Sequence, residues 1–366
     1  MLRQHLGCEV SLHSPVLLKD GARALVIRCQ VNGPRPDVAS VIIKQVKPVP
    51  EAACVYTDWA SLSFLSQFPV TRGLAPRFYG GDVDAGFFVM EDLGGSRSLD
   101  DVLRGEDAGA ARSALMRLAV QTARLQAGTL GCAAQFEQRR SALPPSTFPT
   151  RHKETERWLA GRGRIDDWFA AASCTLPAGF DASLSRIASV FAEPGPFLAF
   201  THGDPAPTNN HVAGDEVRLL DFEYGGFRHA LYDITAWYVL CPLPERMVKE
   251  ISRCYQVELA RACAAARDEA RYEEAWADLC AYRGLWMLAW FPCAILMQDR
   301  PRVGEWTCRQ AMLSTLSRLH QACADRQGLE AVAEAATTLR SALRSRWPEC
   351  GDVLPRWPAL RSLQEE

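Results

Sequence analysis

Residues 197–209 of the chain read FLAFTHGDPAPTN, an apolar run followed by a polar loop. The run Phe197–Phe200 predicts a short buried strand, because it is apolar throughout and ends where polar residues begin. Two prolines then keep the loop out of a helix. The stretch therefore predicts a strand that delivers three polar side chains, those of His202, Asp204 and Asn209, to one loop.

A second apolar run, Val217–Leu220, ends at Asp221 about a dozen residues further on. Phosphoryl transfer needs a carboxylate near the attacking hydroxyl and oxygen ligands for Mg²⁺ on the phosphates. Asp204 suits the first role, and Asn209 and Asp221 suit the second. We expect the two strands to end side by side and to bring these groups together. A structural turn capped by Asp221 is the alternative, and the combination of both motifs disfavours it.

The loop pattern H-G-D-x-x-x-x-N, followed by Asp221-Phe-Glu, resembles the aminoglycoside phosphotransferase family, which shares its fold with choline kinases and, more distantly, protein kinases. The resemblance implies an α+β, bilobal protein-kinase-like fold that uses ATP or GTP with Mg²⁺. It also implies that Asp204 is the catalytic base or hydroxyl-orienting residue and that Asn209 and Asp221 are metal ligands. Asn210 is offset by one position and fits less well, and His202 would brace the loop.

The two lobes that this fold requires can be assigned along the chain. Strand and helix candidates occupy the first part, at Ala24–Val31, Val38–Val46, Tyr56–Phe68 and Phe87–Met90. After two glycines, Gly94 and Gly95, the pattern becomes mostly helical. We therefore expect a nucleotide-binding lobe at 1–93 and a helical lobe at 94–366 that holds the catalytic loop and the acceptor pocket.

A single lysine, Lys44, interrupts the apolar strand candidate before the first helix candidate. A buried ammonium needs an anionic partner, although an edge-strand lysine that reaches water is the simpler alternative. The resemblance implies that Lys44 contacts the nucleotide phosphates and pairs with a carboxylate on the helix. The family usually has a glutamate there, whereas this chain offers Asp58, with Glu51 as the alternative.

The remaining nucleotide contacts are less marked in the sequence. No G-x-G-x-x-G pattern occurs, and the segment KDGAR offers one glycine, Gly21, for the turn over the phosphates. The segment FFVMEDL resembles the strand and hinge that hold a purine base. Met90 would line that pocket, and backbone groups of Glu91 and Leu93 would bond the base.

The resemblance also assigns residues around the acceptor. Asp233 matches an aspartate that anchors the catalytic loop through backbone hydrogen bonds. The helices after it, with the insert 135–180, should form the acceptor pocket. Glu223 and Tyr224 lie in a stretch that also resembles choline and ethanolamine kinases, and we count both as candidate substrate contacts.

Three aromatic residues recur at helical spacing in the last third of the chain, namely Tyr282, Trp286 and Trp290. They predict either core packing or a wall for a sugar ring or a cationic amine. Three acidic residues one to three turns earlier could contact an aminated substrate or form a solvated face; they are Glu273, Glu274 and Asp278.

The composition of the chain indicates which partners and which cellular compartment to expect. The net charge of -2 gives no sign of a nucleic-acid partner. Met1–Leu12 lacks the apolar run of a signal peptide. The apolar stretch Trp286–Met297 is too short to span a membrane, and we expect this stretch to be a buried helix. The 13 cysteines include no C-x-x-C pair, which favours reduced thiols in the cytoplasm. We expect a cytoplasmic monomer or homodimer.

The sequence therefore predicts a kinase that moves the γ-phosphoryl group of ATP or GTP to a hydroxyl of a small acceptor. Aminoglycosides and other antibiotics, sugars and amino alcohols all remain open, as does a choline- or ethanolamine-type metabolic kinase. The Ala- and Arg-rich composition is compatible with antibiotic modification in a high-GC bacterium. A protein kinase is disfavoured because 221–233 leaves little room for an activation loop. A catalytically silent binding protein is disfavoured because every catalytic residue type is present.

Overall fold

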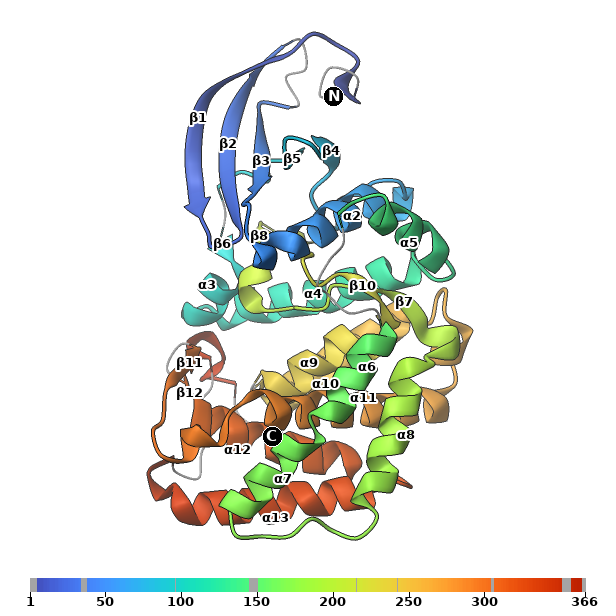
Figure 1. The fold of residues 1–366 in the computed structure, drawn as a ribbon, viewed down its shortest axis with the longest axis vertical. Coiled ribbons are helices and arrows are strands. Elements are labelled where there is room, and N and C mark those ends of the chain that lie inside the picture. The colour runs from blue at the N-terminus through green and yellow to red at the C-terminus, as the bar shows by residue number, and fades with distance from the viewer. Residues whose placement is uncertain are drawn as a thin grey trace.

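The computed structural model describes residues 5–33, 38–95, 97–144, 151–214, 216–241, 243–303, 306–350 and 357–363. A sheet-containing lobe lies at one end of the molecule and a larger helical lobe at the other (Figure 1). The fold is α+β and bilobal, and it confirms the predicted class.

The N-terminal lobe is built on a five-stranded antiparallel sheet with the order β1-β2-β3-β5-β4. Its elements are β1 (Ser11–Asp20), β2 (Ala24–Asn32), β3 (Ser40–Val46), α2 (Val55–Leu65), β4 (Phe78–Asp82) and β5 (Phe87–Glu91). The strand β1 was not among the ranges expected from the sequence. All ten of its residues are exposed, so it lacks the apolar alternation that marks a strand with one buried face.

The pleat of β3 separates its side chains between the two faces of the sheet. Val41 packs with Val89 in a small cluster on the face away from α2. Lys44 is paired with Phe88 of β5, and side chains directly opposite each other in a sheet share a face. Phe88 contacts Trp59 of α2, so the pairing directs Lys44 toward this helix. The register of β3 thus brings the lysine to the side where the two lobes meet.

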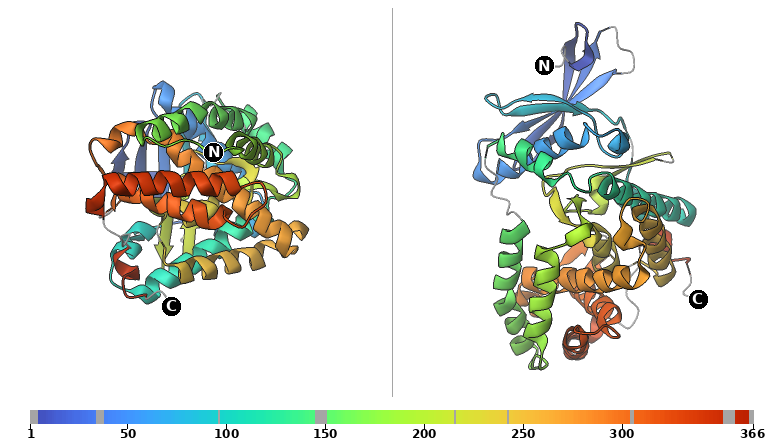
Figure 2. Two further views of the ribbon diagram at one scale, coloured as in Figure 1. Left: turned by 90° about the horizontal axis from the view of Figure 1, so that it is seen from below. Right: turned by 90° about the vertical axis from the view of Figure 1, so that its right-hand side faces the viewer.

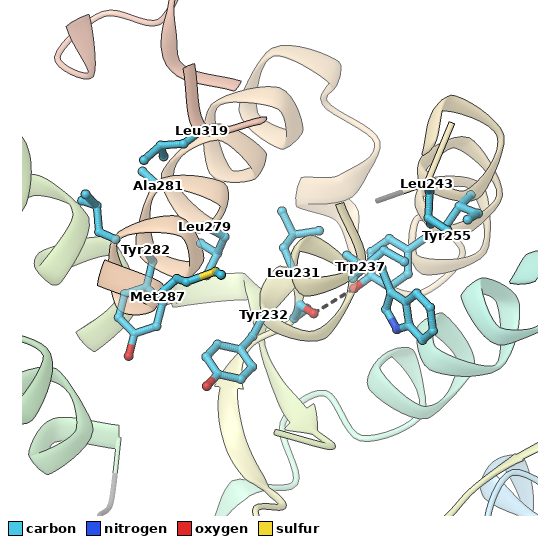
Figure 3. Close-up of a cluster of buried hydrophobic side chains, with 14 of the residues drawn as sticks. Leu231, Tyr232, Trp237, Leu243, Tyr255, Leu279, Ala281, Tyr282, Met287 and Leu319 are labelled. Carbon is cyan, nitrogen blue, oxygen red and sulfur yellow. Dashed lines mark hydrogen bonds between the residues drawn. The ribbon is translucent and has the colours of Figure 1, made fainter. Parts of the chain in front are cut away.

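The C-terminal lobe is mostly helical. Its helices are α3 (Leu99–Arg104), α4 (Ala108–Ala127), α5 (Ala133–Ser141), α6 (Arg151–Ala160), α7 (Arg162–Ala171), α8 (Phe180–Ala192), α9 (Leu231–Leu240), α10 (Glu245–Leu259), α11 (Glu269–Trp290), α12 (Cys308–Cys323) and α13 (Glu330–Arg346). The paired helices α12 and α13 form the end of the molecule far from the sheet (Figure 2). Buried side chains of α9, α10 and α11 fill the centre of the lobe (Figure 3).

Short strands carry the two polar segments singled out from the sequence. The strand β7 (Leu198–Thr201) pairs with β10 (Gly226–His229), whereas β9 (Glu216–Leu219) pairs with β8 (Asn210–Ala213), which also pairs with β6 (Arg97–Ser98). The expectation that the two apolar runs end as neighbouring strands is therefore wrong. Their loops still meet, because each strand pairs with the one that follows the other loop.

The aromatic stretch after Trp286 also differs from its prediction as one buried helix. The helix α11 ends at Trp290, two residues before Pro292, because a proline disfavours helical geometry in the residue that precedes it. The chain continues as a single turn at Cys293–Leu296 and as two short strands, β11 (Pro301–Val303) and β12 (Trp306–Thr307). None of the helices in the described ranges combines the length and the apolarity that a membrane crossing requires.

Burial of His229 at the end of β10 has a consequence for acid stability. Its ring is 1% exposed and stacks on Phe197, and burial lowers its pKa to about 3. The unfolded chain therefore binds one proton more than the folded chain between about pH 6.5 and pH 3. We expect this histidine to remove about 1.4 kcal/mol of unfolding free energy for each pH unit of descent through that window.

The measurement is urea unfolding at a series of pH values on the wild type and on His229→Gln. The variant should lose this component of the slope, whereas His13→Gln, at an exposed position on β1, should keep it. Equal slopes in the wild type and His229→Gln would contradict the assignment.

Candidate active site

The loop 202–209 is held by a single buried carboxylate. Asp233, in the first turn of α9, accepts hydrogen bonds from the backbone N–H groups of His202 at 2.7 Å and Gly203 at 3.0 Å. Gln126 of α4 donates a third bond to it at 3.2 Å. Asp233 is 1% exposed, so its charge depends on these donors. The contacts predicted for Asp233 are therefore present.

His202 connects this loop to the segment that precedes Asp221. Its Nε2 lies 2.7 Å from the carbonyl oxygen of Leu220, and its Nδ1 accepts from the N–H of Asp204 at 3.3 Å. Because Nδ1 accepts, Nε2 carries the proton and donates to Leu220. The N–H of Leu220 in turn bonds the carbonyl of Asn209 at 2.8 Å. The two loops are thus joined on both sides of Leu220.

The side chain of Asn209 folds back on Asp204. Its Nδ2 donates to the Asp204 carbonyl oxygen at 3.1 Å and to Oδ2 at 3.3 Å. The amide oxygen of Asn209 is then the group suited to a metal ion. Asn210 is 1% exposed and donates to the carbonyl of Ala206, so its side chain serves the loop itself.

Gly203 allows the close approach of the loop to the segment after Asp221. Its φ is +86°, and a Cβ at this position would lie 2.2 Å from the carbonyl oxygen of Tyr224. Real Cβ atoms do not approach backbone that closely. Glycine is therefore required here for both its conformation and its size.

We expect Gly203→Ala to lower the free energy of unfolding by more than about 2 kcal/mol and to displace Asp204. Gly214→Ala is the matched control, because Gly214 also has a positive φ, of +56°, but faces open space. Gly214→Ala should lower the free energy of unfolding by only about 1 kcal/mol, which is the contribution of backbone conformation alone. Denaturant unfolding of both variants measures the difference, and equal losses would show that the contact with Tyr224 is unimportant.

Lys44 lies at the centre of a cluster of three carboxylates. Its Nζ is 2.8 Å from Asp58 Oδ2, 2.8 Å from Asp221 Oδ1 and 3.0 Å from Glu223 Oε1. Burial alone would lower the pKa of Lys44, but the three carboxylates raise it well above its ordinary value. The ion pair expected with Asp58 is present, and Glu51, the alternative partner, is exposed.

Asp58 has a second function in this cluster. Its Oδ1 accepts from the N–H of Phe222 at 2.9 Å, while Oδ2 holds Lys44. Desolvation raises the pKa of Asp58, and Lys44 opposes that shift. One helical aspartate therefore fixes both the lysine of the N-terminal lobe and the backbone beside Asp221.

Asp221 has a conformation that few residues adopt. Its φ is +64°, a left-handed value that aspartate tolerates better than most side chains. Burial would raise the pKa of its carboxyl, but Lys44 lowers it below the ordinary value. The side chain remains 33% exposed, so one carboxylate of the cluster stays accessible. Such backbone strain is commonly found at functional sites.

Glu223 is not at the acceptor, where we expected it. It is 4% exposed and binds Lys44 and Arg23, the latter at 2.8 Å. Arg23 follows the turn at Gly21, whose N–H donates to the carbonyl of Ala24 at 3.0 Å. The ion pair ties the β1–β2 turn to the segment after Asp221. Sequence reasoning missed Arg23, because nothing in the local pattern shows which way it points.

The donor set fits a divalent cation. Three carboxylates face Lys44 and Arg23, which leaves one negative charge in the cluster. Among the described residues no group of three or more His, Cys, Asp or Glu side chains forms a complete metal site. Mg²⁺ in kinases is commonly held by one or two protein oxygens together with phosphates. Asp221 and Asn209 offer two such oxygens.

The hinge residues lie at the end of β5. The N–H of Glu91 donates to the carbonyl of Arg77 at 2.8 Å. The backbone group of Glu91 that is left to contact a purine base is therefore its carbonyl oxygen. Its carboxylate pairs with Arg218 of β9 at 2.9 Å. Met90 and Leu93 are half-buried on either side of it.

A cavity of about 260 Å³ opens beside the loop 202–209, between α6, α9 and α11. Asp204 and Gly203 line it, and so does Tyr224, a candidate substrate contact from the sequence. The other lining residues are Glu154, Arg157, Arg228, Tyr232, Leu240, Arg283, Trp286, Met287, Trp290, Phe291 and Arg302. Glu154 and Arg157 come from the insert that was expected to contribute, of which residues 145–150 lie outside the described ranges.

Two of the three aromatic residues that recur along α11 line this cavity, and the third does not. Trp286 and Trp290 line it, and Trp290 is 70% exposed. Tyr282 is 1% exposed and stacks on Trp158 and Phe191 at centroid distances of 5.1 Å and 4.0 Å. Its assignment as a substrate contact is therefore corrected, because Tyr282 packs in the core of the lobe (Figure 3).

Comparison with known proteins identifies the family of the chain. The sequence profile described as the phosphotransferase enzyme family (APH) matches residues 36–284, which is more than half of the chain. No curated protein matches at a significant level.

Several solved structures are similar at low identity. A choline/ethanolamine kinase family protein from Mesorhizobium loti is 17% identical, with a TM-score of 0.41 over 88% of this chain and 92% of that chain. A choline kinase from Cryptosporidium parvum is 12% identical, with a TM-score of 0.45 over 94% and 90%. A macrolide 2'-phosphotransferase from Brachybacterium faecium is 14% identical, with a TM-score of 0.43 over 76% and 96%. The profile match is the finding that decides the family, and by it the chain belongs to the phosphotransferase enzyme family.

Proposed function

We propose that the protein transfers the γ-phosphoryl group of ATP or GTP, in the presence of Mg²⁺, to a hydroxyl of a small acceptor. The observation that carries this proposal is the position of Asp204. Its carboxylate lines the acceptor cavity, while its loop is bonded through His202 and Asn209 to the segment that ends at Asp221.

In this reaction the acceptor hydroxyl attacks the γ-phosphorus from the cavity side. The new P–O bond forms as the bond to the nucleoside diphosphate breaks, and Asp204 orients the hydroxyl and takes its proton. Bound Mg²⁺ supplies charge neutralisation on the phosphates. Asn209 and Asp221 would hold this ion through their side-chain oxygens.

The N-terminal lobe supplies the nucleotide contacts. Lys44 would bond the α- and β-phosphates, held in place by Asp58. The turn at Gly21 would cover the phosphates, and Met90, Glu91 and Leu93 would hold the base. We accordingly propose 1–93 as the nucleotide-binding lobe and 94–366 as the lobe for catalysis and acceptor binding.

The test is incubation with ATP or GTP, Mg²⁺ and a panel of hydroxylated compounds that includes antibiotics, sugars and amino alcohols. A mass gain of one phosphate on an acceptor identifies the reaction. In parallel, the melting temperature is measured with and without Mg²⁺-nucleotide. Melting that is insensitive to nucleotide would contradict the proposal and favour a catalytically silent binding protein.

A further inference from the structure

The acceptor cavity has an unusual balance of charge. Two carboxylates line it, those of Asp204 and Glu154. Four arginines line it as well, and they come from separate parts of the lobe: Arg157, Arg228, Arg283 and Arg302. The catalytic loop and the cluster around Lys44 do not include these arginines, so the proposed chemistry leaves them unexplained.

One carboxylate and one arginine neutralise each other. Glu154 Oε2 lies 2.6 Å from Arg228 Nε, and its other oxygen accepts from the hydroxyl of Tyr232 at 3.1 Å. Arg228 also donates to the Tyr224 carbonyl at 3.0 Å and to Thr201 at 3.1 Å. Both carboxylate oxygens of Glu154 are thus bound, one by Arg228 and the other by Tyr232, and they are not available to a positively charged acceptor.

The environment of Arg283 is different. Its side chain belongs to a residue that is 7% exposed, and its Nε is buried without a hydrogen bond. The guanidinium lies over the ring of Tyr232, 4.4 Å from the centroid. Among the residues that the structure describes, no carboxylate pairs with it. An isolated buried cation is strongly disfavoured unless an anion compensates it.

Arg302 approaches the cavity from β11 in a similar state. It lies over Phe291 at 5.0 Å and contacts the sulfur of Met287 at 3.5 Å. Burial lowers its pKa, and none of the described carboxylates pairs with it to oppose that shift. Two desolvated guanidinium groups therefore face one cavity, and the only carboxylates among its described lining residues are Asp204 and Glu154, of which Glu154 is paired with Arg228.

We propose that the acceptor carries an anionic group, a carboxylate or a phosphate, that binds Arg283 and Arg302 while its hydroxyl reaches Asp204. Guanidinium groups bond such oxyanions in bidentate geometry. The tryptophans Trp286 and Trp290 would cover the apolar part of the same molecule. This inference rests on the proposed function, of which it names the substrate class.

A polycationic acceptor fits the cavity poorly. The acidic residues of α11 that could have received amino groups bind arginines elsewhere: Asp278 and Glu274 pair with Arg186, and Glu273 pairs with Arg326. The face of Tyr232 is already occupied by Arg228 and Arg283, and that of Phe291 by Arg302. An ammonium group would meet guanidinium charge where it would need carboxylates or free ring faces.

The decisive measurement uses sulfate as the probe and does not require the true acceptor. The melting temperature of the enzyme is followed during titration with sodium sulfate, against sodium chloride at matched ionic strength. A non-hydrolysable Mg²⁺-nucleotide is present at saturation, so that sulfate cannot act through the nucleotide site. We expect sulfate to raise the melting temperature of the wild type.

Arg283→Gln should weaken sulfate affinity by about 10- to 100-fold, as should Arg302→Gln. Arg271→Gln, on the exposed side of the same helix, should leave the affinity unchanged. Without sulfate, Arg283→Gln should melt no lower than the wild type, because it removes an uncompensated charge. A sulfate response that is absent in the wild type, or that survives in both cavity variants, would overturn the inference.

A competition experiment separates this inference from the proposed function. Paired acceptors are compared, each a hydroxy acid or a sugar phosphate against its uncharged analogue and an aminated one. We expect phosphorylation to favour the anionic member, and Arg283→Gln to raise its KM about 10- to 100-fold while the nucleotide KM is maintained. Transfer that prefers the aminated member would overturn the inference and leave the proposed function standing. Sulfate binding without transfer to any acceptor would count against the function alone.

Discussion

Replacement of Asp204 by asparagine is expected to lower kcat for phosphoryl transfer by about 10²- to 10⁴-fold. The substitution keeps the shape of the side chain but removes the charge that, in the proposed reaction, orients the hydroxyl and accepts its proton. The bond from Asn209 to the Asp204 backbone carbonyl is retained, and so are the two bonds from Asp233 to the loop. Nucleotide affinity and the melting temperature should therefore change little.

The measurement combines steady-state turnover with calorimetric binding of Mg²⁺-nucleotide. Asp84→Asn provides a control for a carboxylate lost from an exposed turn of the N-terminal lobe, and it should behave as the wild type. Activity of Asp204→Asn within tenfold of the wild type on a true acceptor would show that this carboxylate is not the one beside the hydroxyl.

The second large effect is expected at Lys44, because its ammonium group balances three carboxylates. Lys44→Met should raise the nucleotide KM or lower kcat strongly, and it should also lower the free energy of unfolding by about 3–5 kcal/mol. The methionine replaces the apolar stem of the lysine with an unbranched apolar chain but leaves Asp58 buried without its cation. Lys47→Met, at a partly exposed ion pair with Asp20, should lower the free energy of unfolding by less than about 1 kcal/mol.

A double-mutant cycle with Asp58→Asn tests the origin of that loss. The second substitution removes one of the uncompensated charges, so its effect should be smaller in the Lys44→Met background than alone, by about 1–3 kcal/mol. Denaturant unfolding of the four proteins gives this coupling energy directly. Strict additivity would mean that the two side chains contribute independently, in spite of the 2.8 Å contact.

The parts of the site that could be predicted are those whose chemistry is local in the sequence. The catalytic loop contains its own donors and acceptors, so the spacing of His202, Asp204 and Asn209 was enough to indicate it. Lys44 was recognisable because one charge interrupts an apolar strand. Asp233 was placed by resemblance, and its hydrogen bonds are those expected.

The parts that were missed depend on contacts between distant segments. Strand pairing is such a case: the side-chain pattern of β7 does not show whether β9 or β10 is its neighbour. Glu223 is another, since its position beside Asp221 says nothing about the direction of its side chain. The arginines of the cavity come from four separate elements, and only the folded chain brings Arg283 and Arg302 together.

The attachment of the loop 202–209 to Asp233 affects which steps the binding energy of the substrates must support. Asp233 also accepts from Gln126, whose amide contacts the hydroxyl of Tyr255, and that hydroxyl lies 3.0 Å from the carbonyl of Ala230. The loop is thus tied to buried side chains of α4, α9 and α10, which all belong to one lobe. Ordering this loop requires no contribution from either substrate, so the conformational entropy is lost once, during folding. Attraction between enzyme and acceptor can then act on alignment of the hydroxyl with the phosphorus, where it lowers the barrier.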